Sequence, residues 1–122
     1  MGTRGTDLVL GHRDDVGHEL ADVRERQRTI ADALRVERIG ALPFAHIREL
    51  VTDIVTVTED EIRTAVRLLA RQAGLVAEPG GAAAVAAWLF HPADLPAART
   101  PVAVLSGGNI DPALLAAILA EN

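Results

Sequence analysis

The chain has 122 residues, a formal net charge of −5 and no cysteine. Its length suits one domain with one core, and the lack of thiols excludes disulfides and thiolate metal sites. The negative charge argues against a nucleic-acid partner, because no uncompensated basic surface remains to meet phosphates. The longest apolar run, residues 80–90, is far shorter than the roughly 20 residues that a bilayer span requires. We therefore expect a cytoplasmic protein that binds neither nucleic acid nor membrane.

Residues 14–28 place apolar side chains at helical spacing among charges, which predicts an amphipathic helix. Residues 43–51 predict a second, short helix with Pro43 near its start. The next apolar run, residues 54–57 (IVTV), is rich in β-branched residues and predicts a short buried strand.

The sequence Thr58–Glu61 (TEDE) matches a capping box, the signature of a helix start. In this motif the threonine hydroxyl accepts from the backbone N–H of Glu61, and the Glu61 carboxylate accepts from that of Thr58. Apolar residues continue at helical spacing to Ala73, and Gly74 suits the left-handed position that ends a helix. We therefore expect a well-defined helix between these two signals.

Charge is distributed unevenly, since residues 1–72 carry 24 of the charged side chains and residues 73–122 carry only five. A segment with so few charges exposes apolar surface unless other residues cover it. We therefore expect residues 73–122 to be covered by the preceding helices or by a partner chain.

The C-terminal part contains three further predicted elements. Residues 82–90 are apolar on every face, as in a buried helix, and residues 102–105 predict a second buried strand. Asp111 and Pro112 predict the N-cap and first residue of a final helix. The order strand, helix, helix, strand, helix predicts an α/β fold that is mostly helical, with two or three short strands.

Two features of this part have a functional and a structural interpretation. Ser106–Asn109 (SGGN) joins a predicted strand to a helix, so it predicts either a ligand-binding loop or a plain turn with glycine chosen for its backbone freedom. Glu78 precedes Pro79 in an apolar context, so it is either a carboxylate that faces a site or an acid that faces the free amides of a helix start.

The histidines give no comparable signal. His12 and His18 lie near acids, but their spacing matches no metal-ligand motif, so no metal site is predicted. His46 and His91 are interpreted as structural or exposed side chains.

The order of several short blocks is more specific than any block alone. These blocks closely resemble the C-terminal part of the threonine dehydratase and serine racemase group, fold-type II pyridoxal-phosphate enzymes of the tryptophan synthase beta-like superfamily. They are TIAD at 29–32, IRELV at 47–51, DIVTVTEDEI at 53–62, EPGGAA at 78–83 and VLSGGNID at 104–111. The resemblance covers about residues 28–112. It implies that residues 28–122 form the C-terminal part of a three-layer α/β/α domain, whereas residues 1–27, expected to be helical, match nothing recognisable.

The resemblance implies pyridoxal phosphate as cofactor and assigns cofactor-binding roles to five residues. Ser106 corresponds to the serine that hydrogen-bonds the pyridine nitrogen, and a hydroxyl is a neutral partner that does not force this nitrogen to be protonated. Gly107 and Gly108 let the backbone approach the ring, and Glu78 matches a carboxylate near the cofactor. Ala33 stands where the family usually has glycine, in a loop close to cofactor and substrate.

All twelve basic residues are arginine, and lysine is absent. In the family, a Ser-x-Lys segment supplies the Schiff-base lysine, and a glycine-rich loop binds the phosphate. Both lie upstream, and neither is found here, so we assign no catalytic residue. An amine base is needed both for covalent cofactor binding and for removal of the α-proton.

We therefore expect a C-terminal fragment or split subunit of a threonine/serine dehydratase-like ammonia-lyase, inactive alone. Its partner would be the missing N-terminal half or a homologous subunit, in an oligomer. The complete enzyme would convert L-threonine or L-serine to a 2-oxo acid and ammonia. The alternatives are a non-catalytic interaction module that retains the scaffold, and a truncated reading frame.

Overall fold

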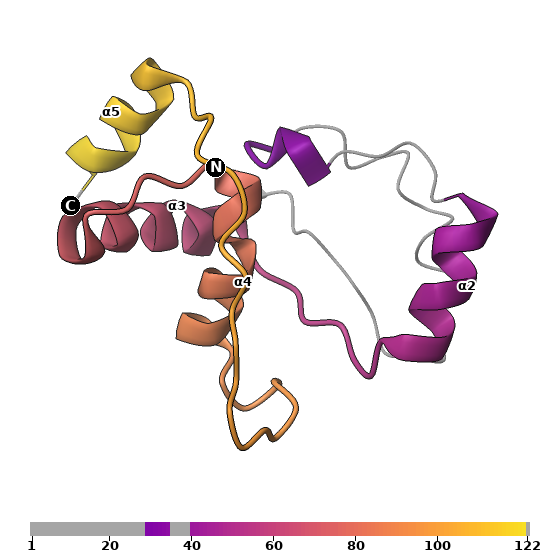
Figure 1. The fold of residues 1–122 in the computed structure, drawn as a ribbon. Helices are drawn as coiled ribbons and strands as arrows, with labels where there is room; N and C mark the ends of the chain where they lie inside the picture. The colour runs from indigo at the N-terminus through magenta and orange to yellow at the C-terminus, as the bar shows by residue number, and fades with distance from the viewer. Residues whose placement is uncertain (1–28, 35–39, 122) are drawn as a thin grey trace, which may run out of the picture.

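The computed structural model describes residues 29–34 and 40–121, which contain helices and irregular segments. In chain order the helical elements are η2 (Asp32–Leu34), α2 (Ala41–Leu50), α3 (Glu59–Leu68), η3 (Leu69–Ala73), α4 (Pro79–Phe90) and α5 (Pro112–Ala120). Helices α3 and α4 form the centre of the arrangement, with α5 beyond α3 and α2 set apart on the opposite side (Figure 1). The helix expected over residues 14–28 lies outside the described residues.

Helix α3 begins with the predicted capping box. The Thr58 N–H donates to Glu61 Oε2 at 2.7 Å, and the Glu61 N–H donates to Thr58 Oγ1 at 3.3 Å. The helix then continues into the single wide turn η3 and ends at Gly74, whose φ of 65° is the left-handed conformation. Both the start and the end signal read from the sequence are confirmed.

Helix α4 begins at Pro79, three residues before the apolar run from which it was predicted. Pro79 has a φ already suited to a helix and lacks the N–H that the first turn would leave without a partner. Helix α4 packs against α3, and its buried residues are small, among them Gly81, Ala82 and Ala86. Small side chains let the two helix backbones approach closely, so Ile62 and Val66 of α3 can fill the space between them.

The core of the described residues is therefore compact and alanine-rich. Its fully or nearly fully buried members are Ala31, Val57, Ile62, Ala65, Val66, Ala77, Ala82, Ala86, Ala87 and Ile118. Several larger apolar side chains of the C-terminal part remain exposed outside it, namely Leu75, Val76, Trp88, Leu89, Phe90, Val102 and Val104.

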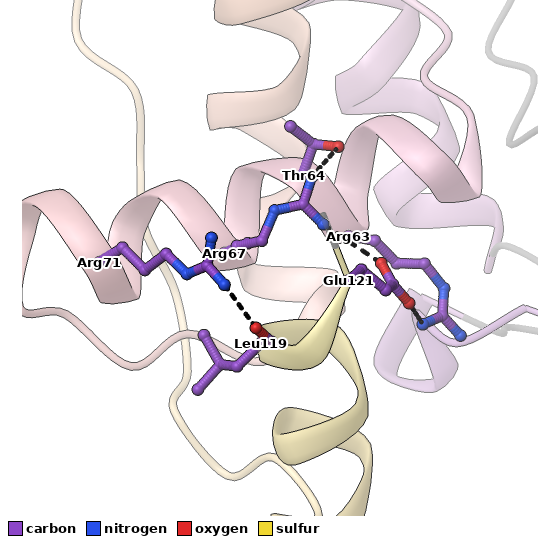
Figure 2. Close-up of polar contacts among 6 residues, drawn as sticks. All are labelled: Arg63, Thr64, Arg67, Arg71, Leu119 and Glu121. Carbon is purple, nitrogen blue, oxygen red and sulfur yellow. Dashed lines mark hydrogen bonds and ion pairs between the residues drawn. The ribbon is translucent and has the colours of Figure 1, made fainter.

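Helix α5 starts as predicted, with Asp111 Oδ1 accepting from the Leu114 N–H at 2.9 Å and Pro112 as the first helical residue. Its C-terminal end is held by arginines that line one side of α3 and η3 (Figure 2). Glu121 accepts from Arg63 at 2.7 Å and from Arg67 at 3.3 Å, and Arg71 donates to the Leu119 carbonyl at 2.6 Å.

Among residues 29–34 and 40–121, the two predicted strands do not form ladders. Within residues 54–57 only Val57 takes part in an isolated bridge, and residues 102–105 run without any regular pairing in the described part of the chain. A strand obtains its hydrogen bonds from a neighbouring strand, and none of the described segments lies alongside as one. Val102 and Val104 are accordingly 80% and 68% exposed.

The described helices include none that combines the length and apolar character needed to cross a membrane.

Candidate cofactor-ring site at the glycine turn

The turn at Ser106–Asn109 lies against the start of α4. The Glu78 N–H, immediately before the helix, donates to the Gly107 carbonyl at 3.2 Å. Gly107 has a φ of 77°, a conformation that side-chain-bearing residues rarely adopt. This hydrogen bond and this backbone conformation together fix where the turn sits relative to α4.

The backbone of the turn approaches the region before and within α4 so closely that side chains are excluded. A Cβ atom added to Gly81 would collide with the Ser106 carbonyl oxygen. A Cβ atom on Gly108 would lie 3.0 Å from the Val76 carbonyl oxygen. Glycine at these positions is therefore a packing requirement, and it brings Ser106 directly onto α4.

Glu78 lies beside Gly107 rather than over the helix start. A Cβ atom on Gly107 would be 2.5 Å from Glu78 Cδ and 2.6 Å from its Oε1. Although Glu78 is the N-cap residue of α4, its side chain makes no capping hydrogen bond. The half-buried carboxylate thus faces the turn and does not cap the helix.

Ser106 is exposed, and its hydroxyl has no hydrogen-bond partner among residues 29–34 and 40–121. A hydroxyl without a partner, next to glycines that have no side chains, can make a hydrogen bond to the edge of a planar, polar ring. These residues therefore fit a non-covalent contact with the pyridine edge of pyridoxal phosphate. They do not fit a covalent link, because none of the 122 residues is lysine.

Ala33, the fifth residue assigned to the site, belongs to η2. This short turn packs against α4, the same helix that carries the glycine turn. The structure therefore places the backbone of Ala33 and the turn at Ser106 on a common support.

A second polar cluster, not predicted from the sequence, joins α3 to the end of α4. His91 Nε2 lies 3.0 Å from Glu61 Oε1, and its Nδ1 lies 3.5 Å from Asp94 Oδ2. The hydrogen bond to Glu61 raises the pKa of His91 above its ordinary value. Burial acts to raise the pKa of Glu61, but the hydrogen bonds from Thr58 and His91 outweigh it and lower this pKa overall.

This cluster gives His91 a structural role, one of the two interpretations drawn from the sequence. The motif TEDE predicted the contact of Glu61 with Thr58, but it did not predict the contact of Glu61 with His91, 30 residues away. No group of three or more histidine or acidic side chains suited to a metal ion occurs within the described ranges.

The chain is similar to known proteins over much of its length. The family described as "Pyridoxal-phosphate dependent enzyme" matches residues 9–107. L-threonine dehydratase catabolic TdcB of Escherichia coli (strain K12) is 45% identical over 84 residues, which are 68% of this chain and 26% of that protein. Human serine racemase is 42% identical over 85 residues, which are 68% of this chain and 25% of that protein.

A solved structure, the crystal structure of a threonine deaminase from T.th., superposes with a TM-score of 0.64 at 39% sequence identity. The superposition covers 76% of this chain and 35% of that one. The chain thus spans about a quarter of the length of the curated relatives it matches. The expected fold class, a mostly helical C-terminal part of the pyridoxal-phosphate enzyme domain, is confirmed.

Proposed function

Because the chain belongs to the pyridoxal-phosphate dependent enzyme family, we propose that its glycine turn forms the wall beside the cofactor ring in an enzyme that deaminates β-hydroxy amino acids. The observation that carries this proposal is the turn itself, which the Glu78–Gly107 hydrogen bond holds on α4 and whose exposed Ser106 hydroxyl has no partner among the described residues.

The substrate class is supported by the names of the relatives. They include threonine dehydratases, a serine racemase and an L-threo-3-hydroxyaspartate ammonia-lyase, all named for amino acids with a hydroxyl on the β-carbon. We propose L-threonine or L-serine as the substrate of the complete enzyme and a 2-oxo acid and ammonia as its products.

Each residue of the turn has a defined task in this proposal. When bound, pyridoxal phosphate supplies the electron sink for cleavage of the bond to the substrate α-hydrogen. Ser106 is the neutral partner of the ring nitrogen, so it orients the ring without adding charge. Gly107 and Gly108 let the turn pack against Glu78 and Val76, and the Glu78 carboxylate beside the turn is an acceptor at the border of the ring.

The lysine that holds the cofactor must come from outside these 122 residues. We propose that a companion segment carries it together with the phosphate-binding loop, and that the assembly is an oligomer in the cytoplasm. The exposed Val102 and Val104 support a companion segment, because they belong to an extended segment that is apolar on two faces. Strands covered on both faces show this pattern.

The first test asks whether the chain binds the cofactor covalently. We expect that the purified chain, incubated with pyridoxal phosphate and reduced with borohydride, gains no side-chain adduct in peptide mass mapping. Mapping separates a side-chain adduct from one on the terminal amine. A stable side-chain adduct would overturn the assignment of the lysine to a companion.

The second test adds a companion, the part of E. coli L-threonine dehydratase that lies outside the matched residues. We expect release of ammonia and a 2-oxo acid from L-threonine only when both pieces are present. Ser106→Ala should lower this rate, whereas the exposed Thr100→Ala should leave it unchanged. Release of neither product from the mixture would contradict the proposed activity.

A non-catalytic interaction module is the second candidate, favoured by the absence of lysine and by the exposed apolar side chains. Stable binding of the companion with no turnover, unaffected by Ser106→Ala, would support this candidate.

A further inference from the structure

The first residue of α3 makes a contact that no local motif requires. Glu59 Oε1 accepts a hydrogen bond from the Ile30 N–H at 3.0 Å, across 29 positions of the sequence. Glu59 is partly buried, and it contributes nothing to the capping box, which uses Thr58 and Glu61. Its carboxylate is therefore committed to the segment before η2.

Residues 29–34, the segment that includes Ile30 and η2, are ordered by further contacts on either side of Ile30. Thr29 Oγ1 accepts from the Ala31 N–H at 3.1 Å, and the Ala31 carbonyl accepts from the Leu34 N–H at 2.9 Å. Ala31 is fully buried in the core that α3 and α4 share. The segment is thus held by the buried Ala31, by the partly buried Ile30 that packs against the core, and by the Glu59 carboxylate.

Residues 29–34 and the glycine turn rest on the same helix. η2 packs on α4, and the Ser106 backbone packs on Gly81 of α4. The separation between the segment and the turn is therefore set by how each is held on α4. Glu78 and Gly81 hold the turn on α4, whereas Glu59 holds the segment to α3, which itself packs against α4.

We propose that Glu59 is a positioning residue that fixes residues 29–34 relative to the glycine turn, and that it acts as a hydrogen-bond acceptor rather than as a charge. In the proposed enzyme, on which this use rests, the separation between the segment and the turn sets the room left for the substrate. The positioning itself is a property of the chain and is tested without cofactor or activity.

The chain offers matched variants. Glu59→Ala removes both acceptor and charge, whereas Glu59→Gln removes the charge and keeps a carbonyl oxygen of the same reach. Asp60→Ala is the control, because Asp60 lies in the same first turn and shares the interaction with the helix dipole. Asp60 is exposed and makes no hydrogen bond within the described residues.

The first measurement is amide hydrogen exchange at Ile30 in the full chain. Glu59→Ala leaves the partly buried Ile30 N–H without its acceptor, so it should speed this exchange roughly tenfold or more. Glu59→Gln and Asp60→Ala should stay within about threefold of the parent chain, since both keep the acceptor. Retained protection in Glu59→Gln would show that Glu59 acts as a hydrogen-bond acceptor and not only as a charge that stabilises α3.

The second measurement uses the absence of cysteine. Two introduced cysteines, Asp32→Cys and Asn109→Cys, take spin labels at exposed positions in the segment and in the turn. Pulsed electron paramagnetic resonance then reports the distances between them. We expect one narrow distribution in the parent chain and in Glu59→Gln, and a broader or displaced one in Glu59→Ala.

Equal effects of Glu59→Ala and Asp60→Ala, or no rescue by Glu59→Gln, would overturn the proposal. An unchanged distance distribution in Glu59→Ala would do the same. If these measurements agree with the expectation while the mixed pieces show no deamination, the positioning stands and only the proposed enzymatic function fails.

Discussion

Helix α3 and the segment 101–105 both carry apolar side chains, but α3 buries its side chains in the core of the described residues, whereas Leu105 is the only large side chain of the segment that packs against this core. Ile62 and Val66 are 1% and 0% exposed, whereas Val102 and Val104 are 80% and 68% exposed. The capping box also satisfies backbone groups at the start of α3, while residues 101–105 have no strand beside them. The described residues therefore pack around α3 and α4, and within them the glycine turn is positioned by its contacts with Glu78 and α4.

The largest effect should come from the core. Ile62→Ala removes a buried side chain and should lower the free energy of unfolding by about 3 kcal/mol. Val102→Ala, the matched change in the exposed segment, should stay within about 0.5 kcal/mol. Urea unfolding of both variants measures the contrast. An equal loss in the two would mean that residues 101–105 are covered in solution.

The second effect concerns the link between the two regions. Gly81→Ala should cost about 2 kcal/mol, because the new methyl group collides with the Ser106 backbone and must displace the turn from α4. Gly74→Ala is the control, since its left-handed φ costs about 1 kcal/mol but its added methyl meets open space. A smaller loss for Gly81→Ala than for Gly74→Ala would show that the turn is not seated on the helix.

A third contrast compares the two caps. Thr58→Ala removes half of the capping box of α3 and should cost about 1 kcal/mol, which Thr58→Ser should restore. Asp111→Ala should cost about 0.5 kcal/mol, because this exposed cap starts a helix with a single buried residue. Thermal unfolding measured at one protein concentration decides the order. A larger loss at Asp111 would contradict the view that α3 carries more of the stability.

The smallest effect is a pH dependence from the His91–Glu61 pair. Folding raises the pKa of His91. Its contribution to the free energy of unfolding is therefore complete below about pH 6.5 and is lost as the pH rises through the raised pKa. Because the pKa of Glu61 is lowered, its contribution is present above its ordinary pKa of 4.5 and is lost as the pH falls through the lowered value. The pair thus stabilises the fold most between these limits.

We expect the urea midpoint of the parent chain to decrease as the pH rises above about 6.5 and through the raised pKa of His91. His91→Gln should flatten this fall, since glutamine does not titrate, whereas His46→Gln on the exposed α2 should leave it unchanged. A fall that persists in His91→Gln would assign the dependence to other groups.

Local signals in the sequence predicted local structure well. Thr58, Glu61, Gly74, Asp111 and Pro112 all occupy the predicted positions, because each acts on backbone groups within a few residues. The predicted strands at 54–57 and 102–105 form no ladder within the described residues, because β propensity describes a fit to a sheet that neighbouring chain must supply.

For the candidate site, sequence and resemblance named Ser106, Gly107 and Glu78, and their geometry is consistent with a shared site. No pattern predicted the contacts of Glu59 with Ile30, of Glu61 with His91 or of Arg63 with Glu121. These partners are separated by 29 to 58 positions, so only the packing of the helices determines that they meet.

The arginine contacts at the end of α5 have a further consequence. The stretch from Gly107 to Glu121 is held at one end by Glu78 and at the other by Arg63 and Arg67. Contacts at both ends restrict this stretch, so part of its conformational entropy is already lost when the protein folds. A ring that docks at Ser106 would therefore bind without ordering the turn, and this preorganisation would favour affinity even though the contact surface is small.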